Sequence, residues 1–127
     1  MAETEKVTVN LNVVDLGKID LLVEQGFFSN RTDFIKSSIR NQLSEHSQVV
    51  DKIITDKTFT LGVAYYSRKE LEKVVASGRV LDIKVIGMLV FDEDVDKDLV
   101  RKSVGSLKVL GVLRASSEVR KALEGVK

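Results

Sequence analysis

"GFFSNRTDFIKSSIR", residues 26–40, marks the point where one helix ends and another begins. Gly26 tolerates the left-handed backbone conformation that often ends a helix, and the two phenylalanines after it would anchor the turn to a core. Ser29 or Asn30 can cap the next helix, and Asp33 would lie in its first turn, where a negative charge suits the helix dipole. The pattern predicts two helices joined by a tight turn. The apolar stripe of the second helix would consist of Ile35, Ile39 and Leu43.

A strand is predicted upstream of the first helix. Residues 6–11 alternate strictly, with Lys6, Thr8 and Asn10 on one face and Val7, Val9 and Leu11 on the other. Asp15 can cap the helix that follows. One strand and two helices bury too little surface to stand alone, and a lone strand has no partner for its backbone groups. We therefore expect a second copy of the chain to supply both, as a two-stranded antiparallel ribbon in a homodimer.

The run "EKVTVNL", followed by "DLGKIDLLVEQGFFSNRTDFIKSSIRNQL", resembles the ribbon-helix-helix superfamily of DNA-binding regulators, in its CopG-like branch. The resemblance covers roughly residues 5–45 and is most specific in the turn and the second helix. It implies that alternate strand residues read bases in the major groove, and these are Lys6, Thr8 and Asn10. It also implies that backbone amides at the start of helix two hold a DNA phosphate, here at Ser29, Asn30 and Arg31.

The charge of this region limits how DNA could be bound. Residues 1–47 carry five basic and seven acidic side chains. A DNA-binding region with a net negative charge would bind non-specific DNA weakly, because the affinity for non-specific DNA comes from the neutralisation of phosphates. The whole chain has a formal net charge of +1, so its overall charge favours no polyanionic partner.

The second predicted helix continues beyond the resemblance. From Ile39 the apolar spacing runs on in steps of four and three, with no glycine or proline to interrupt it. This predicts that helix two extends to about Asp56 as a coiled-coil-like stalk, with His46 on its apolar seam. Residues 48–57 would then form a helical linker.

Residues 58–127 carry an internal repeat. "IKVIGML" at 83–89 echoes "LKVLGVL" at 107–113, and Gly62, Gly87 and Gly111 lie 25 and 24 residues apart. Each glycine stands in an apolar run followed by a helix, and the expected helix caps are Ser67, Asp92 or Asp94, and Ser116 or Ser117. Repeated strand-then-helix order predicts a small parallel sheet with helices on one side, as a short solenoid or an open α/β layer. A three-strand βαβαβ ligand-sensing fold is the competing interpretation.

The predicted fold class is therefore α+β, in three segments. Residues 1–47 form a ribbon-helix-helix domain for DNA binding and dimerisation, and residues 48–57 form the linker. Residues 58–127 form an α/β domain of about three strand-helix repeats, which serves oligomerisation or sensing.

Several classes of function are disfavoured by the composition. With no cysteine and one histidine, the usual nucleophiles, bases and metal ligands are scarce, so we expect no enzyme, no catalytic residues, no cofactor and no metal site. Asp92, Asp94 and Asp96 have the spacing that begins an EF-hand loop, but the sixth position is Lys97 and the twelfth is Ser103. The absence of cysteine and of a long apolar run favours a cytoplasmic protein without a membrane partner.

The sequence thus favours a DNA-binding transcriptional regulator, most simply a repressor, that acts on double-stranded DNA as a homodimer or larger oligomer. Two alternatives stay open. An antitoxin would use the same ribbon for autoregulation and its C-terminal segment to cover a toxin. A scaffolding protein would polymerise through the C-terminal domain and use the ribbon as a dimeriser or DNA tether.

Overall fold

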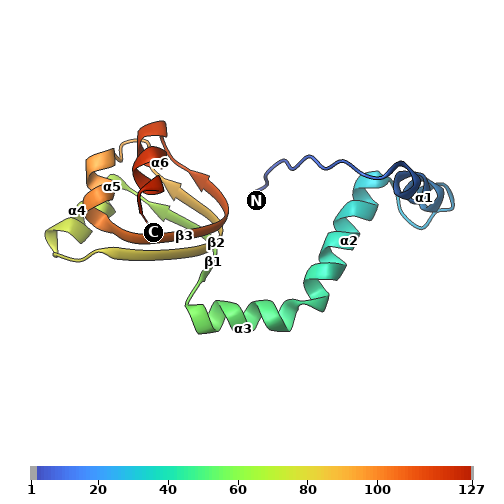
Figure 1. Ribbon diagram of the computed structural model, residues 1–127, viewed down its shortest axis with the longest axis horizontal. Coiled ribbons are helices and arrows are strands. Elements are labelled where there is room, and N and C mark those ends of the chain that lie inside the picture. Colours follow the sequence, from blue (N-terminus) through green and yellow to red (C-terminus); the bar gives the residue numbers. More distant parts are fainter. Residues whose placement is uncertain (1–2, 127) are drawn as a thin grey trace. The chain divides into compact units, whose positions relative to one another are not determined.

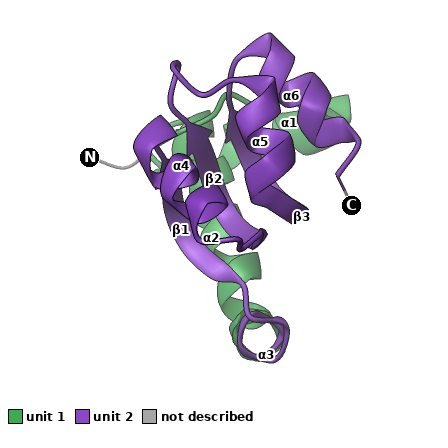
Figure 2. Cartoon of the chain, turned by 90° about the vertical axis from the view of Figure 1, so that its left-hand side faces the viewer, with its two compact units in different colours: residues 1–52 green, residues 53–127 purple. Residues whose placement is uncertain are grey.

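The computed structural model describes residues 3–126, which contain six helices and three strands (Figure 1). The chain divides into two compact units, residues 1–52 and residues 53–127 (Figure 2). None of the helices between residues 3 and 126 is long and apolar enough to cross a membrane.

Helices α1 (Val13–Glu24) and α2 (Arg31–Glu45) lie entirely within the N-terminal unit. The prediction that Asp15 caps the first helix is wrong. The cap is Asn12, whose Oδ1 accepts hydrogen bonds from the amides of Val14 at 2.8 Å and Asp15 at 3.4 Å. Because Asn12 can satisfy these early amides, the helix begins sooner than expected. Gly26 follows α1 with a φ of 86°, as a helix-ending glycine should.

The predicted strand at residues 6–11 is not a strand in the single chain. Residues 3–12 lie in neither helix nor strand, and the first strand of the described chain begins at Thr60. The expected β-α-α order is therefore not present within one copy. A strand requires backbone hydrogen bonds to a neighbouring strand. The described part of the N-terminal unit contains no strand that could pair with residues 6–11.

The prediction of one continuous helix to about Asp56 is wrong. Helix α2 ends at Glu45, His46 takes a φ of −101° and a ψ of 8°, and α3 (Ser47–Lys57) begins directly after it. The His46 ring nitrogen Nδ1 lies 2.8 Å from the Gln42 carbonyl oxygen, so this side chain contacts the backbone of the helix end. Ser44, His46 and Ser47 are all weak helix formers, which the apolar spacing alone does not reveal.

The C-terminal unit is a three-stranded parallel sheet in the order β1-β2-β3. Strands and helices alternate three times, as the internal repeat predicts: β1 (Thr60–Tyr66), α4 (Arg68–Ala76), β2 (Leu81–Phe91), α5 (Lys97–Ser103), β3 (Val104–Arg114) and α6 (Ser117–Glu124). Ser67 and Ser116 cap their helices as expected. Helix α5 is capped by Asp96, not by Asp92 or Asp94, because the Asp96 carboxylate accepts the Leu99 amide at 2.8 Å.

The core lies between one face of the sheet and the three helices that follow the strands. Val85 and Leu89 of β2 are fully buried at the centre of this core. Each helix contributes a fully buried side chain that packs in the same cluster, namely Leu71 of α4, Val100 of α5 and Val119 of α6. Two successive right-handed crossovers place α4 and α5 on the same face, and α6 packs beside α5 after the last strand.

The repeat glycines are aligned across the sheet. Gly62 pairs with Gly87, and Gly87 pairs with Gly111. Their φ angles are 120°, 133° and 124°, a region that side-chain-bearing residues rarely adopt. A Cβ placed on Gly87 would overlap the carbonyl oxygen of Gly62, and one on Gly111 would overlap that of Gly87. The close approach of neighbouring strands therefore requires glycine at these two positions.

We predict that Gly87→Ala destabilises the C-terminal unit more than Gly62→Ala does. Both substitutions force alanine into a strained backbone conformation, at a cost of about 1–3 kcal/mol. Only Gly87→Ala adds a clash with a neighbouring strand, because a Cβ on Gly62 meets no atom within 4 Å. Urea unfolding followed by circular dichroism would measure the difference. Equal losses in the two variants would contradict the proposed backbone contact.

Candidate functional site

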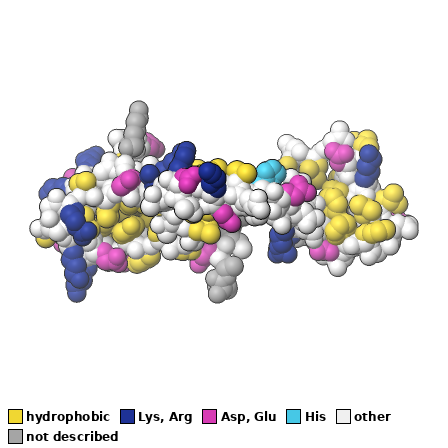
Figure 3. All heavy atoms as spheres, turned by 90° about the horizontal axis from the view of Figure 1, so that it is seen from below, with side chains coloured by type: hydrophobic (Ala, Val, Ile, Leu, Met, Phe, Trp, Pro, Cys, Tyr) yellow, Lys and Arg dark blue, Asp and Glu magenta, His cyan; other side chains and the backbone are white. Residues whose placement is uncertain are grey.

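The N-terminal unit exposes most of its apolar side chains. Ile19, 7% exposed, is the one apolar side chain that is buried in the described part of this unit. Val7 and Val9 are 78% and 68% exposed, and the predicted stripe on α2 is open as well, with Leu43 61% exposed. Figure 3 shows hydrophobic side chains gathered at the surface of the end that carries α1. At about 25 cal/mol per Å² of apolar surface, the unit gains most of its stability only if another surface covers these groups.

The three predicted base-reading residues lie in the irregular segment before α1. Lys6, Thr8 and Asn10 are all exposed, and they alternate with the exposed Val7 and Val9. The segment therefore offers a polar series and an apolar series, and neither is covered by the rest of the unit.

The start of α2 is held by a reciprocal pair of side-chain caps. Asn30 Oδ1 accepts the Asp33 amide at 2.8 Å, and Asp33 Oδ2 accepts the Ser29 amide at 2.9 Å. Of the three residues predicted to hold a phosphate, Ser29 thus donates its amide within the chain. The first intrahelical donor is Phe34, to the Asn30 carbonyl at 3.2 Å. In a helix of this geometry the amides of Arg31 and the following residue point out of the helix end, where an anion can accept them.

Arg31 forms an ion pair that sequence reasoning missed. Its Nε and Nη2 atoms each donate to a carboxylate oxygen of Asp20 at 2.8 Å, which links the start of α2 to α1. The hydrogen bond from Arg31 holds the pKa of Asp20 below its ordinary value, and the pKa of Arg31 is raised by the same contact. The two residues are 11 positions apart, outside the helical spacings that reveal local pairs, so no sequence signal indicated the contact.

The two phenylalanines of the turn have different surroundings. The rings of Phe28 and Phe34 meet edge to face, with their centroids 5.0 Å apart, so Phe28 anchors the turn to α2. Phe27 is 72% exposed and adds to the uncovered apolar surface of the unit.

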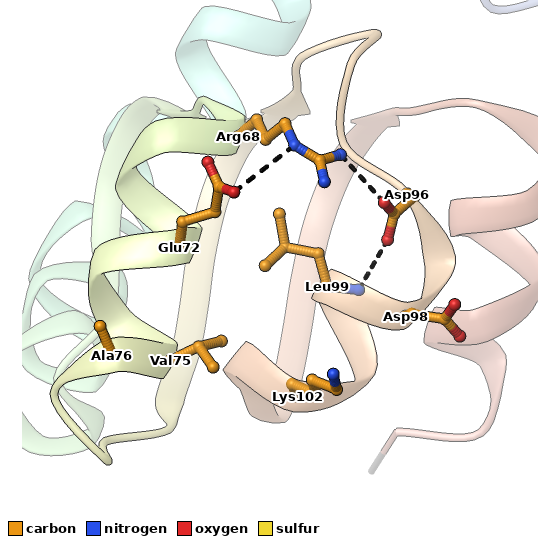
Figure 4. A pocket seen from close by; sticks show the side chains of 8 residues that line it. All are labelled: Arg68, Glu72, Val75, Ala76, Asp96, Asp98, Leu99 and Lys102. Carbon is orange, nitrogen blue, oxygen red and sulfur yellow. Dashed lines mark hydrogen bonds and ion pairs between the residues drawn. The ribbon is translucent and has the colours of Figure 1, made fainter.

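A groove of about 380 Å³ lies between α4 and α5 in the C-terminal unit (Figure 4). Arg68 Nη1 donates to Asp96 Oδ2 at 2.9 Å, and its Nε lies 3.7 Å from Glu72 Oε2. The Leu99 amide, and then Arg68, hold the pKa of Asp96 below its ordinary value. These charged side chains pair with one another and hold the start of α5 against α4. The residues that line the groove thus serve the packing of the two helices.

A second hollow, of about 400 Å³, lies where β2 and β3 end, and its lining includes Phe91, Arg114 and Ser116. Nearby, a hydrogen bond to Asp92 raises the pKa of Tyr65. Carboxyl ends of parallel strands are where ligands bind in open α/β sheets. Between residues 3 and 126, however, no group of three or more His, Cys, Asp or Glu side chains could hold a metal ion.

We predict that Asp20→Asn lowers the stability of the N-terminal unit at neutral pH but not in acid. The folded-state pKa of Asp20 is depressed below 3.8, so the ion pair contributes stability above that value. This contribution is lost as the pH falls through the folded-state pKa. Urea unfolding of both proteins over a pH series should show a gap that closes in acid. A gap that persists when Asp20 is protonated would contradict a role for its charge.

Comparisons with known proteins identify the chain at the level of a family. Neither the curated proteins nor the solved structures contain a significant match to the chain. The sequence profile of the Ribbon-Helix-Helix transcriptional regulator family matches residues 2–120, which include most of both units. The likeness is therefore much longer than the roughly 40 residues that the N-terminal motif covers. Because the profile spans nearly the whole length, the chain belongs to the Ribbon-Helix-Helix transcriptional regulator family.

Proposed function

We propose that the chain is a homodimeric, sequence-specific DNA-binding repressor. Membership of the family implies DNA binding, transcription regulation and dimerisation. The observation that supports the finer proposal is the uncovered apolar surface of the N-terminal unit, with Ile19 as its one buried apolar side chain among the described residues. A second copy, packed on this surface, would give both copies the core that each lacks.

In the proposed dimer, residues 6–11 of the two copies pair as an antiparallel ribbon. Val7, Val9 and Leu11 would face the helices, where they meet the stripe of α2. The opposite face would then present Lys6, Thr8 and Asn10 twice to the major groove, which has the width for a two-stranded ribbon. Lysine and asparagine can bind guanine and adenine edges respectively, so these residues suit direct base reading.

The start of α2 would bind a flanking phosphate. The amides of Arg31 and its neighbour, together with the positive end of the helix dipole, favour an anion there. Asp20 pairs with the Arg31 side chain, so the backbone rather than the guanidinium carries most of this contact. This weak electrostatic contribution fits a protein that depends on base reading more than on net charge.

We further propose that residues 1–47 bind DNA, that residues 48–57 form a linker and that residues 58–127 form an accessory domain. We also propose that the protein is not an enzyme. The folded core of the C-terminal unit disfavours the antitoxin alternative, since toxin-covering segments are usually short and disordered until bound. The scaffolding alternative predicts DNA binding that is indifferent to sequence.

We predict that replacing Lys6, Thr8 and Asn10 together by alanine abolishes sequence preference. Each base contact is worth about 1–3 kcal/mol of discrimination, and the dimer makes every contact twice. Selection of bound DNA from a random pool should yield a palindromic motif with the wild type and none with the variant. Lys18→Ala is the matched control, because it removes an equal charge from the exposed surface of α1. An unchanged motif in the triple variant would refute base reading by this segment.

We predict opposite effects on DNA affinity for the two partners of the Asp20–Arg31 pair. Arg31→Ala leaves the negative charge of Asp20 unpaired beside the phosphate site, so it should weaken binding to all sequences alike. Asp20→Asn releases the Arg31 side chain and removes a negative charge, so it should strengthen binding to all sequences. Titrations of operator and random DNA at several salt concentrations would measure both effects. If the two variants weakened binding equally, the pair would serve the fold alone.

A further inference from the structure

The sheet of the C-terminal unit has a second face, which the three helices of its core do not cover. We call it the open face, and its apolar side chains are Leu61, Val63, Tyr65, Ile86, Met88, Val90, Leu110 and Val112. They stand in register across the three strands, so that Val63, Met88 and Val112 form the central row.

The open face is apolar, and four of its eight side chains are exposed. Leu61 is 67% exposed, Val63 56% and Leu110 49%, whereas Met88 at the centre is shielded to 7%. Parallel sheets are almost always covered on both faces, because their strands are apolar on both sides. An uncovered parallel sheet of this composition therefore indicates a missing partner layer.

The size of the open face argues for a partner that is already held close. Three strands about 4.8 Å apart, each apolar over about five residues of about 3.3 Å, give an area of about 240 Å². A stable interface between free proteins buries about 800 Å² on each partner. The family dimer places a second copy of the same chain nearby, at an effective concentration far above that of a free partner.

Charge determines how a second copy would lie on the open face. Lys84 and Lys108 share a row at the amino ends of the strands, with Asp82 beside Lys84 at 4.0 Å. Asp92, Glu93 and Asp94 follow β2 at the carboxyl end, where Arg114 ends β3. A two-fold axis across the strands, along the central row, makes the strands of the two copies antiparallel and sets β2 opposite β2, so Lys84 of each copy meets Asp92 at the end of the other β2. An axis along the strands would instead bring the lysine rows together.

We propose that the open face packs against the same face of a second copy of this chain, with the strands of the two sheets antiparallel. The inference rests on the dimer of the proposed function, which supplies the second copy. In this arrangement the central row of one copy lies over the central row of the other, so Val63 of one copy lies next to Val63 of the other.

The absence of cysteine from the natural chain gives a direct test. Val63→Cys in the full-length protein should form a covalent dimer with a short bismaleimide. The matched control is Val80→Cys, because Val80 is 66% exposed and lies before β2, outside the open face. The expected yield for Val63→Cys is severalfold above that of the control, provided that both variants unfold like the wild type. Equal yields would overturn the inference.

A charge exchange provides a second, independent measurement in the Val63→Cys background. Lys84→Glu alone and Asp92→Lys alone should each lower the yield of covalent dimer, because each places like charges opposite one another. The two substitutions together should restore it. Loss without restoration would overturn the antiparallel arrangement.

These outcomes are separable from a failure of the proposed function, since cross-linking is measured without DNA. A protein that selects a palindrome but fails to cross-link would refute the packing of the open face alone. A protein that cross-links but selects no motif would refute sequence-specific reading and leave the packing intact.

Discussion

Parallel pairing of β2 with a strand on each side is the constraint on which the C-terminal unit depends. A parallel neighbour can be reached only by a crossover, and a crossover in a sheet of this twist is right-handed. The strand order β1-β2-β3 applies the same crossover twice in the same direction, so α4 and α5 lie on one face, and α6 joins them there after β3. The apolar character of the opposite face follows from the same topology, because central parallel strands are apolar on both sides.

Much of the C-terminal fold could be predicted because its signals are local and repeated. The glycine spacing identified the strands, and the three glycines prove to be register partners. Caps at Ser67 and Ser116 followed from side-chain chemistry alone. The cap of α5 was misplaced because side-chain chemistry alone does not distinguish three aspartates within five residues. Each of them can cap a helix, and only the fold selects Asp96.

What the sequence could not provide is contact between distant residues or between chains. The Asp20–Arg31 pair joins two helices whose packing no local pattern records. The prediction of a continuous stalk was wrong because it relied on the apolar spacing and gave too little weight to the weak helix formers around His46. Residues 6–11 alternate as the residues of a strand do, but alternation does not supply the second backbone that a ribbon requires. The base-reading and phosphate-binding residues therefore stay a prediction, supported by the family and by the uncovered apolar surface.

The order of the strands also has a consequence for the folding of the protein. Register partners in the sheet are only 25 and 24 residues apart, at Gly62, Gly87 and Gly111, so the sheet assembles within one chain and at a rate independent of protein concentration. In the proposed dimer, the N-terminal unit, with Ile19 as its one buried apolar side chain in the described part, completes its core only when a second molecule binds. At low protein concentration the newly made chain would therefore exist first with a folded C-terminal sheet and an incomplete N-terminal unit, and the concentration of the protein itself would decide when it can bind DNA.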